Sequence, residues 1–236
     1  MAHPGPMIPP PLTALARWLE AELGEPEPLR RDGPAEVRRL ALALEPADLP
    51  PTLEADALFL HRSRRVGDGW PGLGVLAAHD GFDTHLTTGP NWRLARALGW
   101  TDVEEVVWEG RVVGLSATPP QRTWRSFRAA MHAELGGEDT SWPPEPPPGS
   151  LRLALMNAMN PALIGHVAAQ GVRVYLTGQL RPSAAGAARA QGLGVAALGH
   201  RRTELWGLRR LARELEGAFP GLETRVYGDG TVPRVG

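Results

Sequence analysis

The feature that most constrains the fold is a regular alternation of apolar runs and helical stretches in the last third of the chain. Strand-like runs occur at residues 151–156, 172–176 and 193–198, and a helical stretch follows each of them. A final strand is expected at residues 224–227. Strands joined through helices run parallel and are connected right-handedly. The alternation therefore predicts an α/β fold with a parallel or mixed sheet.

The N-terminal part of the chain shows a less regular mixture of the same elements. Apolar runs predict strands in four segments, residues 37–44, 55–60, 72–78 and 103–117. Helices are expected in three segments, residues 12–23, 91–98 and 123–135.

A proline-rich segment at residues 142–150 predicts a linker or a stiff surface loop. It divides the chain into an N-terminal α/β lobe, residues 1–141, and a C-terminal βαβ lobe, residues 151–236. The same pattern is compatible with one compact unit.

Composition excludes several kinds of chemistry. The 236 residues include no cysteine, and all 25 basic residues are arginine, which excludes thiolate nucleophiles, cysteine-bound zinc and Schiff-base lysines. A net charge of -1 argues against a dedicated nucleic-acid or membrane-surface protein. No apolar run has the ~18 residues of a membrane span, and the proline-rich start lacks the features of a signal peptide. We therefore expect a cytoplasmic protein.

Two short phrases far apart in the sequence each place a histidine four residues before a carboxylate. They are His79 with Asp83 and His200 with Glu204, and each begins where an apolar run stops. His61 ends a third apolar run. In α/β sheets, ligands bind beyond the carboxyl ends of the strands, where these three histidines fall. Imidazoles and carboxylates brought together there are typical ligands of a divalent metal.

Each phrase, taken alone, has a structural interpretation as well. Glu204 suits a helix start, where its charge favours the helix dipole while His200 faces water. Asp83 can cap a turn, and His79 can bond a backbone carbonyl. His85 is expected in a loop or beside the ligands. The residues themselves leave both interpretations open.

Arginines accompany the candidate ligands in both halves of the chain. Arg62, Arg64 and Arg65 follow His61, and Arg202 lies between His200 and Glu204 in the second histidine phrase. Guanidinium groups suit phosphate oxygens, so Arg64 and Arg202 are candidates for binding a small anionic ligand. A solvated loop is the alternative interpretation of such a run of charges.

Four phrases, at residues 56–62, 78–83, 175–179 and 199–204, occur in a recognisable order. They resemble, in turn, the His-His strand end, the His-x3-Asp segment, the Thr-Gly-Glu segment and the Gly-His-x3-Glu signature of the Nif-three-like dinuclear metal-centre family. Some members of that family are named GTP cyclohydrolase type two. The resemblance implies two α/β lobes with a two-metal cleft between them, and a ring-shaped homohexamer built as a trimer of dimers.

Carried over residue by residue, the resemblance implies that His79 lines the site and that four residues are metal ligands: His61, Asp83, His200 and Glu204. Arg62 stands where the family has its second histidine, and Gln179 replaces the Glu of the Thr-Gly-Glu segment. A guanidinium within ~4 Å of a divalent ion is repelled by several kcal/mol. We therefore expect one ion or none rather than two. Such ligands suit Zn, Fe, Mn or Ni.

Two functions are consistent with these residues. The first is a divalent-metal-binding member with a degenerate site, acting as a metal-dependent hydrolase of a nucleotide or phosphate ester. The alternative is a non-catalytic binding or scaffold ring protein that has lost metal chemistry, which the replacements at Arg62 and Gln179 favour. Nucleic-acid binding by arginines ranks last because the net charge is close to zero.

Overall fold

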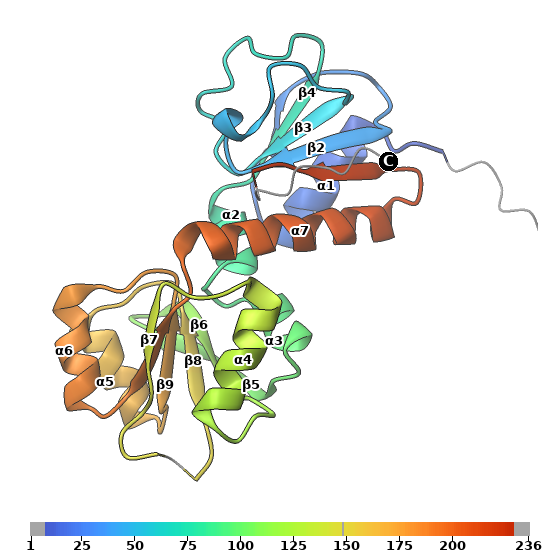
Figure 1. The fold of residues 1–236 in the computed structure, drawn as a ribbon. Coiled ribbons are helices and arrows are strands. Elements are labelled where there is room, and N and C mark those ends of the chain that lie inside the picture. The colour runs from blue at the N-terminus through green and yellow to red at the C-terminus, as the bar shows by residue number, and fades with distance from the viewer. Residues whose placement is uncertain (1–7, 148, 229–236) are drawn as a thin grey trace, which may run out of the picture. The chain divides into compact units, whose positions relative to one another are not determined.

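The computed structural model describes residues 8–147 and 149–228 and divides into two compact units (Figure 1). The first unit contains the chain up to Phe82 and again from Gly207 onward, and the second contains Asp83 to Trp206. Two helices carry the chain from one unit to the other, α2 (Asp80–Leu86) and α7 (His200–Ala218).

A five-stranded mixed sheet forms the centre of the first unit. Its strands lie in the order β1 (Leu29–Arg31), β4 (Gly74–Ala77), β3 (Ala57–Leu60), β2 (Arg39–Ala43) and β11 (Glu223–Val226). The last four run parallel to one another, and β1 is antiparallel to β4. All residues of β3 and β4 are buried, as is typical of parallel strands covered on both faces.

Helix α1 (Leu12–Leu23) packs closely against this sheet. A Cβ atom on Gly74 of β4 would lie 2.6 Å from Cδ2 of Leu12, so glycine lets the Leu12 side chain approach the strand this closely. A short 3-10 helix, η1 (Pro46–Asp48), lies between β2 and β3.

The second unit is built on a six-stranded mixed sheet. Its strands lie in the order β5 (Thr101–Trp108), β6 (Arg111–Thr118), β8 (Leu153–Met156), β9 (Val174–Thr177), β10 (Gly194–Ala197) and β7 (Thr140–Trp142). Within this sheet, β8, β9 and β10 run parallel to one another, and the other neighbouring strands pair antiparallel.

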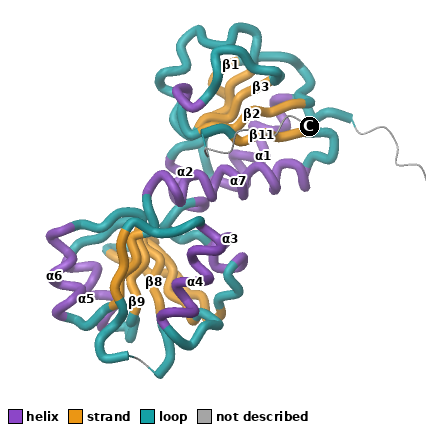
Figure 2. The backbone as a smooth tube through the Cα atoms, viewed as in Figure 1, coloured by secondary structure: helices purple, strands orange, loops and turns teal. Residues whose placement is uncertain are grey.

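Helices cover both faces of this second sheet, as Figure 2 shows. One face carries α3 (Trp92–Ala97) and α4 (Trp124–Leu135), and the other carries α5 (Pro161–Ala169) and α6 (Pro182–Ala190). Side chains of β8 alternate between the two cores: Leu153 and Leu155 join α3 and α4, whereas Ala154 and Met156 join α5 and α6. This period of two is what a strand buried on both faces requires.

The α/β class is confirmed, and each strand and helix predicted from the sequence corresponds to one in the structure. Sequence reasoning missed β1, β7 and α2. The units also differ from the predicted lobes. Strands on either side of the proline-rich segment, β7 and β8, share one sheet, and β11 returns to the first sheet beside β2. In the described part of the chain, the helices lack the combination of length and apolar character needed to cross a bilayer.

Candidate metal centre

His61 lies at the carboxyl end of β3. Its backbone N–H donates to the carbonyl of Ala43 at 3.2 Å, which continues the parallel ladder beyond the strand. The side chain is only 1% exposed, and its ring stacks on Phe82 with the centroids 4.6 Å apart. Packing therefore fixes the orientation of this imidazole.

His79 follows the neighbouring strand, β4, and directly precedes α2. Its Nδ1 lies 2.9 Å from Nε2 of His61. One of these nitrogens therefore carries a hydrogen that the other accepts, and the same lone pairs are available to a metal once that proton leaves. The expected placement of both histidines at the carboxyl ends of parallel strands is confirmed.

Asp83 completes the group from the first turn of α2. Ligand atoms of His61, His79 and Asp83 all lie within 4.8 Å of one another. Three atoms bound to one ion at about 2.0–2.2 Å lie about 3.3–3.8 Å from one another. The side chains must therefore draw together by about 1 Å to share an ion, and two imidazoles with a carboxylate are a donor set that fits a divalent metal.

Glu25 organises this edge of the first unit, a role that sequence patterns do not indicate. The carboxylate is buried, and its Oε2 accepts hydrogen bonds from the backbone N–H groups of His79 and Gly81, both at 3.0 Å. Arg30 pairs with its other oxygen at 3.3 Å. A Cβ on Gly81 would lie 2.2 Å from the carbonyl oxygen of Leu23, so the start of α2 must be glycine there. Only the folded chain reveals this role, because Glu25 stands in a turn of Gly, Pro and Glu.

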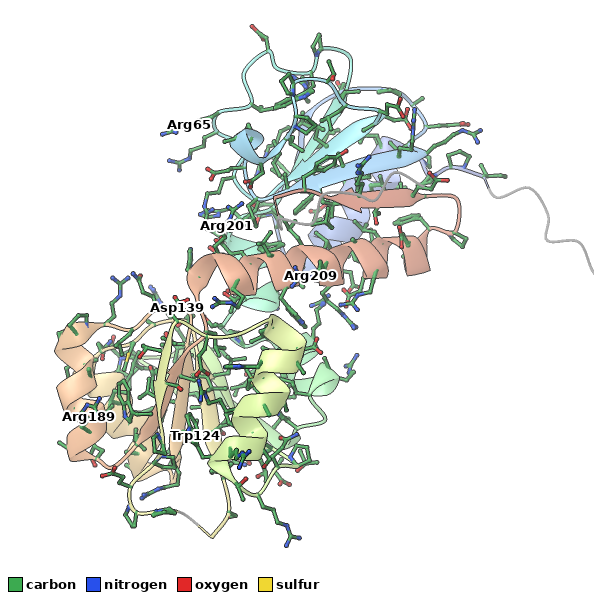
Figure 3. The ribbon with its side chains drawn as sticks, viewed as in Figure 1. Arg65, Trp124, Asp139, Arg189, Arg201 and Arg209 are labelled. Carbon is green, nitrogen blue, oxygen red and sulfur yellow. The ribbon has the colours of Figure 1, made fainter. Side chains whose placement is uncertain are left out.

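A cavity of about 580 Å³ opens beside the histidines within the first unit. Besides Glu25, its lining includes charged and ligand-type side chains: Arg30, His61, Arg62, Arg64, His79 and Asp80. Arg64 of the predicted anion site therefore lines the same cavity as the two histidines. Arg65 extends from the same loop in Figure 3.

Arg31 of β1 holds the loop that leads away from these arginines. Its guanidinium donates at 3.0–3.2 Å to four backbone carbonyls, those of Gly67, Gly69, Trp70 and Leu73. This loop therefore has a fixed course although it contains no helix or strand.

His200 and Glu204 form a second histidine–carboxylate pair, in the second unit. Helix α7 begins at His200, just beyond the carboxyl end of β10, and Glu204 lies one turn later. Nε2 of His200 lies 3.1 Å from Oε1 of Glu204, whose side chain is 2% exposed. The predicted pairing on one helix face is confirmed.

Arg202 has a structural partner in the described part of the chain. Its NH1 donates to Oδ1 of Asp139 at 2.9 Å and to the carbonyl oxygen of Leu198. These contacts hold the segment before β7 against the end of β10. Its predicted role in binding an anion remains a prediction.

The structure thus brings His61, His79 and Asp83 into one group and pairs His200 with Glu204. That all of them serve one ion remains a prediction. His79, which the family resemblance implies only as a residue lining the site, belongs to the group that could bind a metal. His85 lies at the end of α2, where burial and then the charge of Arg93 lower its pKa.

These observations define the class: an α/β protein in which imidazole and carboxylate groups gather at the carboxyl ends of parallel strands. The model of Duf34/NIF3 (NGG1p interacting factor 3) matches residues 71–229, and the chain belongs to this family. The family expected from the resemblance is therefore confirmed.

Similar proteins agree with this assignment. A "GTP cyclohydrolase 1 type 2 homolog" of Deinococcus radiodurans is 28% identical over 148 residues, 62% of this chain and 56% of that protein. One of the same name from Chlamydia trachomatis serovar D is 28% identical over 181 residues, 73% of this chain and 67% of that protein. The solved structure of protein ybgI, described as of unknown function, has a TM-score of 0.72 at 22% identity. That match covers 92% of this chain and 97% of ybgI and shows the fold.

Proposed function

We propose that this protein binds one divalent metal ion through His61, His79 and Asp83. The observation that carries the proposal is the mutual distance of their ligand atoms, all within 4.8 Å. Two imidazoles and one carboxylate leave coordination positions open for water or substrate, as in catalytic zinc and non-haem iron sites. The predicted ligands His200 and Glu204 are further candidates for the same ion.

The proposed activity is hydrolysis of a phosphate ester or nucleotide. A divalent ion at this position would lower the pKa of a bound water to about 7 and polarise a phosphoryl oxygen. The chain's own contribution is cationic: Arg62 and Arg64 line the cavity beside the histidines and can orient an anionic substrate. The names of the two relatives are compatible with metal-dependent chemistry on a nucleotide.

Metal binding is tested by calorimetric titration of metal-free protein with Zn²⁺ and Mn²⁺, together with elemental analysis of the purified protein. We expect about one equivalent to bind wild-type protein, and His61→Ala and Asp83→Asn to weaken binding at least tenfold. His166→Ala, which removes a histidine from α5, serves as the matched control. Equal metal binding by wild type and both site variants would refute the proposal.

A metal-binding protein without catalysis is the second candidate, and Arg62 favours it. Its side chain lines the cavity next to His61, where the family resemblance places a ligand. We expect Arg62→His to raise the number of bound ions above that of wild type, because a fixed positive charge is exchanged for an imidazole. Arg64→His is the matched control from the same cavity. Hydrolysis of a panel of nucleotides and phosphate esters by metal-loaded wild type would exclude this second candidate.

A further inference from the structure

We propose that the second unit contains a binding site for the phosphate group of a small organic phosphate, separate from the cavity that His61 and His79 line in the first unit. The site is a cavity of about 350 Å³ at the carboxyl ends of β8, β9 and β10. Its lining includes Thr88, Asn157, Thr177, Gly178, Arg181 and His200. This volume lies within the range of small-molecule sites, about 300–1,000 Å³. The inference goes beyond the proposed metal function because it needs no metal.

The charge of the cavity favours an anion. Arg181 lines it and makes no ion pair with a carboxylate among the described residues. The described lining residues include no Asp or Glu. An arginine without a carboxylate partner keeps its guanidinium available for phosphate oxygens.

Two helices begin at this cavity. His200 is the first residue of the 19-residue α7, and Arg181 is the N-cap of the nine-residue α6. A helix start carries partial positive charge and N–H groups without an intrahelical acceptor, which favour anions. Both helix starts therefore reinforce the charge of Arg181.

Two buried threonines give independent support for a ligand. Thr88 is 6% exposed and Thr177 is 2% exposed, and both line the cavity. Neither side chain makes a hydrogen bond to another described residue, so each hydroxyl keeps its donor for a ligand in the cavity. An oxygen of a bound phosphate would accept from these hydroxyls.

Gly178 keeps the space between these groups open. A Cβ atom at this position would lie 3.3 Å from Oγ1 of Thr88 and 3.8 Å from Nδ1 of His200. A side chain here would therefore fill the place where the hydroxyl and the imidazole converge. The missing Cβ makes the end of β9 a cradle for a ligand.

The test is calorimetric titration of metal-free, full-length protein with inorganic phosphate and then with ribose 5-phosphate, chloride being the background anion. Arg181→Ala and Gly178→Ala alter the cavity. Arg189→Ala is the matched control, because it removes an arginine from the last turn of the same helix, α6 (Figure 3). His61→Ala reports on the metal cavity, and circular dichroism verifies that each variant is folded.

We expect saturable binding of ribose 5-phosphate to wild type, tighter than binding of inorganic phosphate. Arg181→Ala should weaken it about tenfold or more, and Gly178→Ala should weaken it as well. Arg189→Ala and His61→Ala should bind like wild type. Absence of saturable binding, an equal loss in Arg181→Ala and Arg189→Ala, or a loss in His61→Ala that matches Arg181→Ala would overturn the proposal.

Discussion

Glu25 shows how one buried carboxylate can define the geometry of a neighbouring site. It accepts from two backbone N–H groups at the start of α2, the helix that carries Asp83, and it also pairs with Arg30. A negative charge at a helix N-terminus is stabilised by the helix dipole and by the N–H groups that lack intrahelical acceptors. The position of His79 therefore depends on a residue more than fifty positions away in sequence.

Glu25→Gln should reduce both stability and metal affinity. The amide removes the charge and one acceptor, and we expect the free energy of unfolding to fall by about 1–3 kcal/mol. Because outer partners orient metal ligands, affinity for Zn²⁺ should fall about tenfold. Chemical denaturation and calorimetry measure the two effects, with Glu27→Gln as the exposed control. Wild-type metal affinity in Glu25→Gln would show that Glu25 does not position the site.

At the scale of elements, sequence reasoning succeeded where hydrophobic pattern alone decides the structure. The runs that became β8, β9 and β10 are short, apolar and followed by helices, so their order predicted the parallel core of the second sheet. Strands β1 and β7 have three residues each, and they form by backbone pairing with the edges of β4 and β10, respectively. Helix α2 contains Gly, Asp and Thr, which are weak helix formers, and depends on the buried Glu25 at its start.

Glu138 links two such elements, α4 and β7. Its side chain is 4% exposed and contacts Arg128, His132 and Ser141. Burial alone would raise the pKa of Glu138, but hydrogen bonds from Ser141 and Arg128, together with the contact to His132, outweigh burial and lower it. The carboxylate form is therefore favoured in the folded protein.

The pH dependence of stability follows from this lowered pKa. Since the folded-state pKa is below the unfolded value of about 4.3, the stabilisation is complete above that pH and is lost as pH falls through the folded-state value. Glu138→Gln should lower the free energy of unfolding at pH 7 by about 1–3 kcal/mol and lose less stability on acidification than wild type. Denaturation curves from pH 7 to pH 3 measure this, with Glu109→Gln as control. Parallel curves for wild type and Glu138→Gln would contradict the role assigned to this carboxylate.

At the scale of the whole molecule, the predicted division at residues 142–150 does not describe the chain. The units are instead discontinuous: β11, near the end, completes the first sheet beside β2, and the second unit is inserted between Phe82 and Gly207. Sequence patterns identify strands but not their distant partners, which is why the lobes were misplaced. The family could be predicted because its four sequence phrases occur in a recognisable order along the chain, whichever unit each phrase belongs to.

The family resemblance also predicts assembly into a hexamer. The hairpin of β5 and β6 exposes a cross-strand pair, Val107 and Val112, which are 49% and 38% exposed. Such an apolar pair on an edge strand is a surface that self-association would cover. Light scattering after size exclusion should give about six times the 25.4 kDa chain mass, and Val107→Glu should give smaller species. A monomer mass for wild type would contradict this expectation.

The most direct test of the metal centre is a crystal structure obtained with one equivalent of Zn²⁺, with the ion located by anomalous scattering at the zinc edge. We predict one peak within about 2.0–2.2 Å of a nitrogen of His61, a nitrogen of His79 and a carboxylate oxygen of Asp83. Additional bonds to His200 and Glu204 would agree with the full predicted ligand set. The absence of a peak, or an ion bound without His61, His79 and Asp83, would contradict the proposed metal centre.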